Sequence, residues 1–367
     1  MPTPEEYQAA GLFDPVVHAH SGRLELLDWL TEMGLSVAEM VDGLERDVLP
    51  ALATDRHLIG GRPMSRAEAL EKSGIEAGLF DEYTNALGFV RLYDSPDETL
   101  GYTDAEVSML SVFGAMAAMF SHDEALAFVR VLGAALARVA DAGVVLFLSD
   151  VENAMLESGG SEFEMAQAGY AAIGLIDGFL EMLDPAFRRH LQQATERFRR
   201  ATISDERFQY RYAVGFVDLV GFTERSGSMA PRDLAAFLRD FEAKTLQAVS
   251  DAGARVVKLI GDEVMFVGDD PDTVCRAASA LMTGFDSGGY LVVPRGGVAY
   301  GSVLARGGDY FGTVVNLASR LTDEAVPQEI LVTAEVAEVA TSCVFEPAGR
   351  RMVKGFADPV AVFSLVG

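Results

Sequence analysis

The hydrophobic pattern of this chain changes near residue 210, and this change constrains the fold more than any other feature. Up to about residue 200 the apolar residues recur at helical spacing, which predicts one helix after another. Beyond residue 210, short runs of β-branched and aromatic residues alternate with helical stretches. We therefore predict an all-α N-terminal bundle followed by an α+β domain. The chain has 367 residues, half of them hydrophobic, so each domain can bury its own core.

Five helix starts in the first half are marked by Ser or Thr followed three residues later by Glu. In such a capping box the hydroxyl accepts a bond from one unpaired backbone amide, and the Glu carboxylate accepts one from another. The pairs are Ser36/Glu39, Ser65/Glu68, Thr103/Glu106, Ser121/Glu124 and Ser161/Glu164. Residues 103–156 and 161–183 are apolar on more than one face, as expected of buried helices. We predict a helical domain over residues 1–186.

An arginine-rich helical stretch, FRRHLQQATERFRR at 187–200, follows the bundle. We interpret residues 187–206 as a linker helix, although a last, solvated helix of the bundle would have the same composition. Residues 207–367 form the predicted α+β domain. Its strands are expected at 212–220, 255–260, 264–267, 290–293, 296–305 and 329–333, and its helices at 231–253, 272–285 and 313–325.

Composition narrows the possible partners and location. Acidic residues outnumber basic ones 55 to 29, and the formal net charge of -26 disfavours nucleic acid and anionic membranes as partners. Cys275 and Cys343 lie far apart in the sequence, which indicates neither a disulfide framework nor a zinc site. The N-terminus lacks a signal-peptide pattern, and the most apolar run, 109–120, is shorter than the ~18 residues of a membrane span. We expect a cytoplasmic protein without a membrane span.

Two aspartates stand where a metal-bound phosphate could lie. In FVDLVGFTE an apolar strand ends at Asp218, and Gly221-Phe222-Thr223 forms a turn whose amides can approach a ligand closely. Asp262 lies at the tip of a predicted hairpin, RVVKLIGDEVMFVGD. Two carboxylates plus substrate phosphates are the usual ligands of Mg²⁺, and two ions ~3.5–4 Å apart can clamp an in-line displacement. Either aspartate alone would be an ordinary turn residue.

Asn316 and Arg320, in NLASR, are four residues apart on a predicted helix and therefore share one face. An amide donor beside a bidentate cation suits the charge that develops at phosphorus in a transition state. An exposed arginine with a polar neighbour would give the same pattern, and such pairs are common on helices.

Residues 207–367 resemble the catalytic domain of the class III nucleotidyl cyclases, the adenylyl and guanylyl cyclase family. The motifs FVDLVGFT, KLIGDEVM, GDYFGTVVNLASRL and VKGF appear in the family's order and at similar spacing. The resemblance implies a ferredoxin-like α+β fold and two divalent metal ions per active site, Mg²⁺ or Mn²⁺. It also implies metal ligation by Asp218, Asp262 and the carbonyl of Leu219.

The phosphate-binding residues follow from the same resemblance. The amides of Gly221, Phe222 and Thr223 would cradle the triphosphate. Lys354, in VKGF, would contact the phosphates, although a plain surface lysine would look the same.

The resemblance places Lys258 and Asp309 at the family's two base-reading positions. Adenine offers an acceptor at N1 and a donor amino group at C6, which a lysine and a carboxylate complement, whereas guanine has the opposite pattern. Asn316 would orient the ribose, and Arg320 would stabilise the α-phosphate in the transition state. We therefore expect an adenylyl cyclase that converts ATP to 3',5'-cyclic AMP and pyrophosphate, with no role assigned to Glu263.

The family builds each active site from two subunits. The metal ligands come from one subunit, and the base readers with the Asn/Arg pair come from the other. Since all of them occur in this chain, the resemblance implies a head-to-tail homodimer with two shared sites and an inactive monomer. Mammalian relatives carry an arginine at the position of Ser302, so one phosphate contact differs, and Arg306 or Lys354 could replace it.

All histidines lie in the helical half, at His18, His20, His57, His122 and His190. An unperturbed pKa of ~6.5 makes them candidates for acid sensing, although scattered histidines are more often plain surface or core residues. The layout also resembles actinobacterial soluble cyclases whose helical N-terminal domain restrains the catalytic dimer and responds to pH. We hypothesise an autoinhibitory module up to about residue 200, with 187–205 setting the dimer geometry. An apolar-ligand pocket within 109–183 is an alternative to a packed core there.

Three other interpretations are open from the sequence. IGDEVMF is similar to the Gly-Gly-Asp-Glu-Phe signature of diguanylate cyclases, but Ile260 replaces the first glycine. Residues 64–89 could form a DNA-binding helix-turn-helix around Gly74, although the second helix carries acids with the wrong charge for phosphate contact. The third is a catalytically silent homologue that only binds nucleotide.

Overall fold

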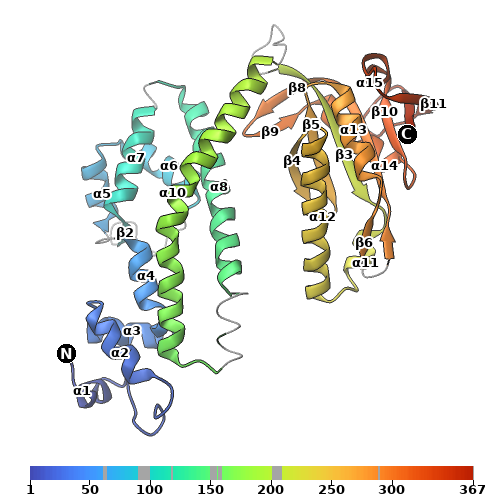
Figure 1. Cartoon of the computed structure of the whole chain (residues 1–367). Helices are drawn as coiled ribbons and strands as arrows, with labels where there is room; N and C mark the ends of the chain where they lie inside the picture. Colours follow the sequence, from blue (N-terminus) through green and yellow to red (C-terminus); the bar gives the residue numbers. More distant parts are fainter. Residues whose placement is uncertain are drawn as a thin grey trace. The chain divides into compact units, whose positions relative to one another are not determined.

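The computed structural model describes residues 1–60, 64–89, 100–116, 119–148, 155, 159–200, 209–287 and 290–366. The chain divides into two compact units, Met1–Arg188 and Arg189–Gly367. The first is helical apart from one short ribbon, and the second is built on a mixed β-sheet (Figure 1). The predicted fold class, an all-α bundle followed by an α+β domain, is confirmed. Among the described residues, no helix combines the length and hydrophobicity that a membrane crossing requires.

The first unit consists mainly of short helices around two separate cores. The elements are α1 (Pro4–Ala9), α2 (Arg23–Glu32), α3 (Val37–Glu45), η1 (Leu49–Ala51), α4 (Leu52–Ile59), α5 (Arg66–Ser73), α6 (Ala77–Leu87), α7 (Asp104–Met116), α8 (His122–Phe147) and α10 (Glu162–Arg200). Leu26, Leu27 and Leu30 of α2 lie in one core, and Phe80 and Tyr83 of α6 lie in the other. An antiparallel ribbon of β1 (Met64–Ser65) and β2 (Leu100–Tyr102) was not predicted from the sequence.

The predicted capping boxes form at four of the five helix starts. Ser36, Ser65, Thr103 and Ser161 each accept the amide of the Glu three residues later, whose carboxylate bonds back to the cap. Ser121 directly precedes α8 as predicted, but its hydroxyl makes no capping bond in the described structure. Acidic residues in the first turn of α8 still complement the helix dipole there.

Helix α10 is one unbroken helix that belongs to both units. The stretch predicted as a linker helix, 187–206, continues α10 as far as Arg200, and residues 201–206 lie outside the described residues. Near the start of α10, Phe163 and Tyr170 pack edge-on against Trp29 of α2. These contacts anchor the helix in the first unit.

Helix α8 is buried only in its first half. Leu126 and Val129 pack in the core that contains α6, whereas Val144, Val145 and Leu146 are 57–64% exposed. The expectation that residues 103–156 and 161–183 are buried on more than one face is therefore wrong. α7 and the start of α8 each bury a single face, and Val112 on the other side of α7 is 60% exposed. In α10, Leu175 is 75% exposed. The end of α8 is apolar in sequence, but no other element of the described structure covers Val144, Val145 and Leu146 in a single chain.

The second unit contains a sheet with the strand order β11-β12-β10-β8-β3-β5-β4, and β9 pairs with β8. These strands are β3 (Gln209–Leu219), β4 (Arg255–Ile260), β5 (Glu263–Gly268), β8 (Pro294–Arg306), β9 (Asp309–Phe311), β10 (Ile330–Thr333), β11 (Val344–Arg351) and β12 (Val360–Val366). A separate hairpin joins β6 (Phe285–Ser287) to β7 (Tyr290–Val292). The strand pairs are antiparallel except β8 with β10.

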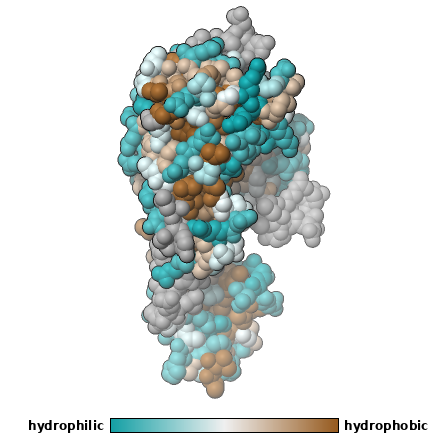
Figure 2. Space-filling model, turned by 90° about the vertical axis from the view of Figure 1, so that its right-hand side faces the viewer, coloured by the Kyte–Doolittle hydropathy of each residue, from teal (hydrophilic) through white to brown (hydrophobic). Residues whose placement is uncertain are grey.

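Helices cover both faces of this sheet. The elements are α11 (Phe222–Ser226), α12 (Pro231–Asp251), α13 (Pro271–Leu281), α14 (Thr313–Glu324) and α15 (Ala334–Val339) (Figure 1). Ala213 and Val217 of β3 pack on the side of α12 and α13, whereas Val214 and Phe216 belong to the core on the side of α14. Because strand side chains alternate, Asp218 lies at the end of β3 on the α14 side. Figure 2 shows one face of the molecule, on which small hydrophobic patches lie among hydrophilic residues.

Close packing of α14 on the sheet depends on a glycine. A Cβ atom at Gly297 of β8 would lie 2.3 Å from the Ala318 carbonyl oxygen, so no other residue fits there without moving the helix. This contact fixes the distance between α14 and the strand that carries Arg295.

Candidate functional site

A row of charged residues crosses the sheet where β3 ends. In the strand register Arg295 of β8 lies opposite Asp218, and Asp218 lies opposite Glu263 of β5. Asp262 precedes Glu263 in the tight turn between β4 and β5, where Gly261 has a φ of 65°. The structure therefore brings together the two aspartates predicted as metal ligands, and it adds an arginine that the sequence analysis did not single out.

Arg295 is held at three points. Its Nε and Nη2 donate to Asp218 Oδ2 at 3.1 and 3.0 Å, and its Nη1 donates to the Asp323 carbonyl at 2.8 Å. The side chains of this ion pair are mostly buried, with relative exposures of 26% for Arg295 and 22% for Asp218. No periodicity or motif in the sequence points to Arg295, because its importance depends on which strand lies beside β3.

Burial and neighbouring carboxylates raise the pKa of two acidic residues in this site. Burial raises the pKa of Glu263 to about 7. Three neighbouring carboxylates add to this effect and one guanidinium opposes it: Asp218, Asp323, Asp262 and Arg295. Burial also raises the pKa of Asp262, and the charge of Asp218 adds to it. A group of carboxylates with too little positive charge around it attracts cations.

Glu263→Gln is expected to stabilise the metal-free protein at pH 8 by about 2 kcal/mol, or about 5 °C in Tm, after allowance for partial solvation. The folded-state pKa of about 7 lies above the ordinary value of 4.5. The folded protein therefore binds this proton more tightly than the unfolded chain does, and stability falls as pH rises from 4.5 to 7. Glutamine keeps the shape and stays neutral.

The measurement is thermal unfolding of both proteins in the presence of a chelator, from about pH 4 to pH 8. The difference between them should vanish at the acidic end and grow toward neutrality. Glu346→Gln, at an exposed position of β11, serves as the control and should change little at any pH. If Glu263→Gln lowered the Tm at pH 8, the carboxylate would be stabilised as an anion and the electrostatic interpretation would be wrong.

The donor set fits a hard divalent cation. Asp218 and Asp262 supply carboxylate oxygens at adjacent strand ends, and the side chain of Leu219 is buried, so that residue could offer only its carbonyl. Within the described ranges, no three His, Cys, Asp or Glu side chains converge into a closed metal cage. Two carboxylates, with other positions left for phosphate oxygens and water, are the arrangement that Mg²⁺ favours.

Lys258 of β4 and Asp309 of β9 contact each other, although 51 residues separate them. The distance from Nζ to Oδ2 is 2.5 Å, and the side chains are 40% and 27% exposed. The second carboxylate oxygen of Asp309 accepts the Tyr310 amide at 2.8 Å, which orients the group. An ammonium donor and a carboxylate acceptor thus lie side by side at a partly exposed position.

Asn316 and Arg320 are both exposed on α14, one turn apart as predicted. Arg320 Nη1 donates to Asp323 Oδ2 at 3.1 Å, and the two side chains are 44% and 56% exposed. Asp323 therefore contacts two arginines, Arg320 through its carboxylate and Arg295 through its carbonyl.

The residues predicted to bind phosphate differ in what they can offer. Gly221 has a φ of 72°, a left-handed conformation that favours glycine, and it directly precedes α11. The Phe222 ring is buried and stacks on Phe237 at 4.5 Å, so only its backbone could contact a ligand. Thr223 is exposed, and Lys354 is exposed in the turn between β11 and β12.

Ser302 and Arg306 are both exposed on β8. Arg306 lies opposite Asp309 in the register of β8 with β9, which places it next to the Lys258–Asp309 pair. Arg306 therefore supplies a positive charge near that pair, which the neutral Ser302 cannot do.

The five histidines are all at least partly exposed. Three make defined contacts: His18 with the Asp14 amide, His57 with the Tyr170 ring, and His122 with the Glu82 carboxylate at 2.8 Å. His20 and His190 are exposed. Four of the histidines belong to the first unit, and His190 lies on the part of α10 that belongs to the second, so the five form no single cluster.

Residues 64–89 do fold as two helices joined at Gly74, which has a φ of 67°. The acidic residues of the second helix are used within the unit: Glu76 caps α6, Asp81 pairs with Arg66 at 2.8 Å, and Glu82 contacts His122. Because Phe80 and Tyr83 of the same helix are buried in the core, this hairpin is packed as part of the helical unit.

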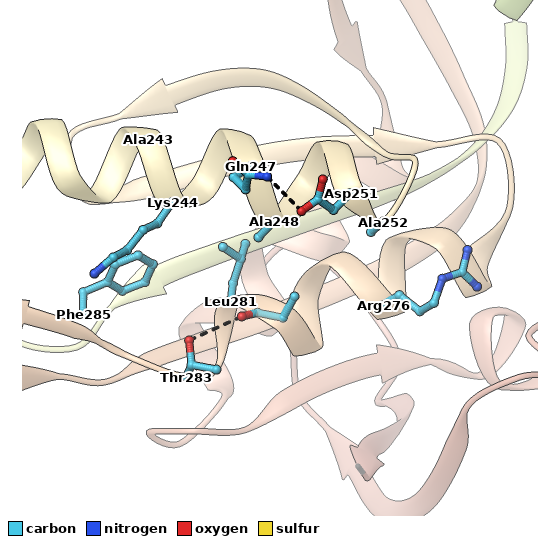
Figure 3. A pocket seen from close by; sticks show the side chains of 11 residues that line it. Ala243, Lys244, Gln247, Ala248, Asp251, Ala252, Arg276, Leu281, Thr283 and Phe285 are labelled. Carbon is cyan, nitrogen blue, oxygen red and sulfur yellow. Dashed lines mark hydrogen bonds between the residues drawn. The ribbon is translucent and has the colours of Figure 1, made fainter.

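A groove of about 680 Å³ lies between α12 and α13 (Figure 3). Leu281 and Phe285 contribute its apolar lining, and Lys244 and Arg276 contribute positive charge. None of the predicted site residues lines it, so it is separate from the row of charged residues at the end of β3.

Cys275 and Cys343 lie close together although they are far apart in the sequence. Both are free cysteines, and the first is buried. Burial raises the pKa of both thiols, and each lies within hydrogen-bonding reach of the other. Burial therefore keeps the thiols protonated at neutral pH, and the fold brings together two cysteines that the sequence separates.

Two family models match the chain. Residues 5–193 match an adenylate cyclase regulatory domain, and residues 291–367 match an adenylate and guanylate cyclase catalytic domain. The second match includes Asp309, Asn316 and Arg320, whereas Asp218 and Asp262 precede it.

Curated relatives match over most of the chain. An uncharacterized protein of Mycobacterium tuberculosis is 33% identical over 98% of this chain and 93% of its own length. An adenylate cyclase of Streptomyces coelicolor is 32% identical over 74% of this chain and 70% of its length. A pH-sensitive adenylate cyclase of Mycobacterium tuberculosis is 29% identical over 94% of this chain and 88% of its length. Among solved structures, the adenylyl cyclase CyaB of P. aeruginosa covers 43% of this chain and 95% of its own, with 24% identity and a TM-score of 0.38.

Proposed function

This chain belongs to the class III adenylate and guanylate cyclase family, and we propose that it converts ATP to 3',5'-cyclic AMP and pyrophosphate. The observation that carries the choice of ATP over GTP is the contact between Lys258 and Asp309. Lysine can donate to the N1 acceptor of adenine, and the carboxylate can accept from its C6 amino group. The relatives that are named adenylate cyclases support the same substrate.

In this proposal Asp218, Asp262 and the Leu219 carbonyl hold two divalent cations, Mg²⁺ or Mn²⁺. Divalent cations at such a site supply Lewis-acid stabilisation of the charge on the phosphate oxygens. Asn316 orients the ribose so that its 3'-hydroxyl lies in line with the leaving pyrophosphate. Arg320 stabilises the charge that develops on the α-phosphate, for which a planar bidentate cation is suited.

The triphosphate would be bound by the amides of Gly221, Phe222 and Thr223, because the left-handed glycine lets the backbone approach the ligand. Arg306 or Lys354 would supply the phosphate contact that an arginine makes in mammalian relatives. The exposure of both side chains in the single chain leaves them able to reach a ligand.

We infer a head-to-tail homodimer in which each site takes its metal ligands from one chain and its other groups from the partner. Apolar side chains around the Lys258–Asp309 pair support this inference. Ile260, Leu304 and Phe311 are 49%, 40% and 48% exposed, and the last two lie opposite each other in the register of β8 with β9. Exposed apolar residues beside a polar site are typical of an interface.

We also propose that the helical unit inhibits the catalytic unit and responds to pH. Support comes from its match to the regulatory-domain model and from the relative that is named pH-sensitive. His122 is the strongest candidate sensor, because protonation would turn its contact with Glu82, between α8 and α6, into an ion pair. Helix α10 is the element that would transmit the change, since it belongs to both units.

The experiment is a product assay with ATP and, separately, GTP in the presence of Mn²⁺ or Mg²⁺, from pH 5 to pH 8. Full-length protein and a fragment from about residue 205 are compared. We expect cyclic AMP from ATP, its loss with a chelator, and a pH dependence that is strong in the full chain and weak in the fragment.

Three other results would each contradict part of the proposal. Cyclic dinucleotide from GTP would favour the diguanylate-cyclase alternative. No cyclic product at concentrations where the dimer forms would favour a silent nucleotide-binding homologue. Equal pH profiles for the two proteins would remove the regulatory role of the helical unit.

A further inference from the structure

Arg295 is the cation that the structure places against the metal-binding carboxylates, and the proposed function gives it no role. It lies on β8, next to β3 in the sheet, and its register partner is Asp218. Both Nε and Nη2 donate to the same carboxylate oxygen, Oδ2. The ion pair thus engages one oxygen of Asp218 and leaves Oδ1 to face other partners.

The third contact of Arg295 makes this arrangement rigid. Its Nη1 donates to the Asp323 carbonyl in the last turn of α14, where the carbonyl groups form the negative end of the helix dipole. The guanidinium is planar and permanently charged, so three donor contacts fix both its position and its plane. The strand end at Asp218 and the end of α14 are thereby held at a set separation.

The same helix end also contacts Arg320, through the Asp323 carboxylate. One polar chain therefore runs from Asp218 through Arg295 and Asp323 to Arg320. It links the proposed metal ligand to the residue proposed to stabilise the transition state.

We propose that Arg295 is a positioning residue that orients the Asp218 carboxylate for metal binding. This inference rests on the proposed function, because it takes Asp218 to be a metal ligand. A carboxylate anchored through one oxygen presents the other in a defined direction, and hydrogen-bond partners behind a metal ligand are worth about 10–100-fold in metal affinity.

Two effects of Arg295 on a cation have opposite signs, and the choice of variant separates them. The positive charge of Arg295 repels a bound cation and weakens metal binding. Its hydrogen bonds orient the Asp218 carboxylate and strengthen metal binding. Arg295→Lys keeps the charge and loses the planar fork, so it changes the geometry alone. Arg295→Gln removes the charge as well.

The test measures Mn²⁺ binding to the full-length protein without nucleotide, from the electron paramagnetic resonance signal of free Mn²⁺. We expect Arg295→Lys to bind Mn²⁺ about tenfold more weakly than the wild type. In the cyclase assay, its kcat should recover as Mn²⁺ is raised, while the KM for ATP at saturating Mn²⁺ stays within about twofold.

Arg350→Lys is the matched control, because Arg350 also uses Nε and Nη2 on a single oxygen, the Pro359 carbonyl, and lies on β11 of the same sheet. It should bind Mn²⁺ as the wild type does. A Tm measurement on each variant shows whether it is folded, and Arg295→Gln is the second variant if Arg295→Lys is not. Weaker Mn²⁺ binding by Arg295→Gln, despite the removed repulsion, would support positioning.

Three results would each overturn the inference: Mn²⁺ binding by Arg295→Lys with wild-type affinity, tighter Mn²⁺ binding by Arg295→Gln, or a loss of kcat that does not depend on metal concentration. So would a wild-type protein that binds no Mn²⁺ in the millimolar range, since there would be no site to prepare. The binding comparison uses no nucleotide, so it can fail while cyclic AMP is formed. Equally, the cyclase proposal can fail while the binding difference stands.

Discussion

Asp218→Asn is expected to lower cyclic AMP formation by at least about a thousandfold, because a neutral amide cannot replace a carboxylate in holding divalent cations. Arg320→Ala is expected to cause a loss of about a hundredfold or more, since it removes the cation that would face the α-phosphate. The two residues are joined within one chain through Arg295 and Asp323. In a head-to-tail dimer they nevertheless act in different active sites.

Co-expression of the two variants tests that arrangement. A dimer of one Asp218→Asn chain and one Arg320→Ala chain contains one site with both defects and one site with neither. Random pairing makes half of the dimers mixed, so the mixture should recover about a quarter of wild-type activity. Initial rates are measured for each variant alone and for the co-expressed mixture, purified through one tag that both chains carry so that all dimers are retained.

The control is the double variant, with both substitutions in the same chain, co-expressed with itself, which should stay inactive. Recovery close to zero in the mixed sample, with dimers present, would show that each chain builds its own complete site. That result would contradict the shared-site proposal and leave the metal role of Asp218 intact.

Exchanging the charges of the base-reading pair, with Lys258→Glu and Asp309→Lys together, is expected to shift the ratio of kcat/KM for ATP over GTP by about a thousandfold toward GTP. A site built to bond one donor and acceptor pattern rejects the opposite pattern strongly, because polar groups that the bound base covers are then left unpaired. The exchanged pair keeps its own ion pair, since the two side chains contact each other in the wild type. The measurement is kcat/KM for both nucleotides with the same metal.

The single substitutions are the controls. Each leaves two like charges in contact, so each should lower activity with both nucleotides rather than exchange the preference. Exchange of Lys244 and Asp240, an exposed ion pair on α12 at 2.7 Å, should leave the preference unchanged. If the exchanged variant kept the wild-type preference for ATP, Lys258 and Asp309 would not read the base.

The carboxylates of the site could be predicted from the sequence because they stand in local patterns. Asp218 ends an apolar strand before a glycine turn, and Asp262 lies on the tip of a hairpin, and both positions are as expected. Arg295 could not be predicted in this way. It is 77 residues from Asp218 in the sequence, and only the pairing of β8 with β3 brings the two together.

The pKa of Glu263 is a second property that could not be predicted from the sequence. Its position beside Asp262 was evident, but its pKa depends on carboxylates from β3 and α14 that converge only in the fold. The pairing of Cys275 with Cys343 likewise depends on long-range packing. The pKa of a group depends on the charges and burial around it in the folded protein, whereas the sequence shows only which residues are adjacent along the chain.

Local interactions explain what the sequence determined by itself. Three features were predicted correctly: the switch from helices to alternating strands and helices, four of the capping boxes, and the ends of α12, α13 and α14 to within a few residues. They depend on contacts between residues three or four positions apart, or on strand periodicity. The edge strand β11, its neighbour β12 and the short β9 were missed. Their residues become strands through pairing with distant segments rather than through their own pattern.

The tertiary structure alone decided the rest. It showed that 187–200 continues α10 and that the apolar end of α8 is exposed in a single chain. It also placed Arg295 between the Asp218 carboxylate and the end of α14. Each of these features depends on which surfaces contact one another after the chain has folded. Strand register and helix packing determine those contacts between residues that are far apart in the sequence, and local periodicity carries no information about such pairs.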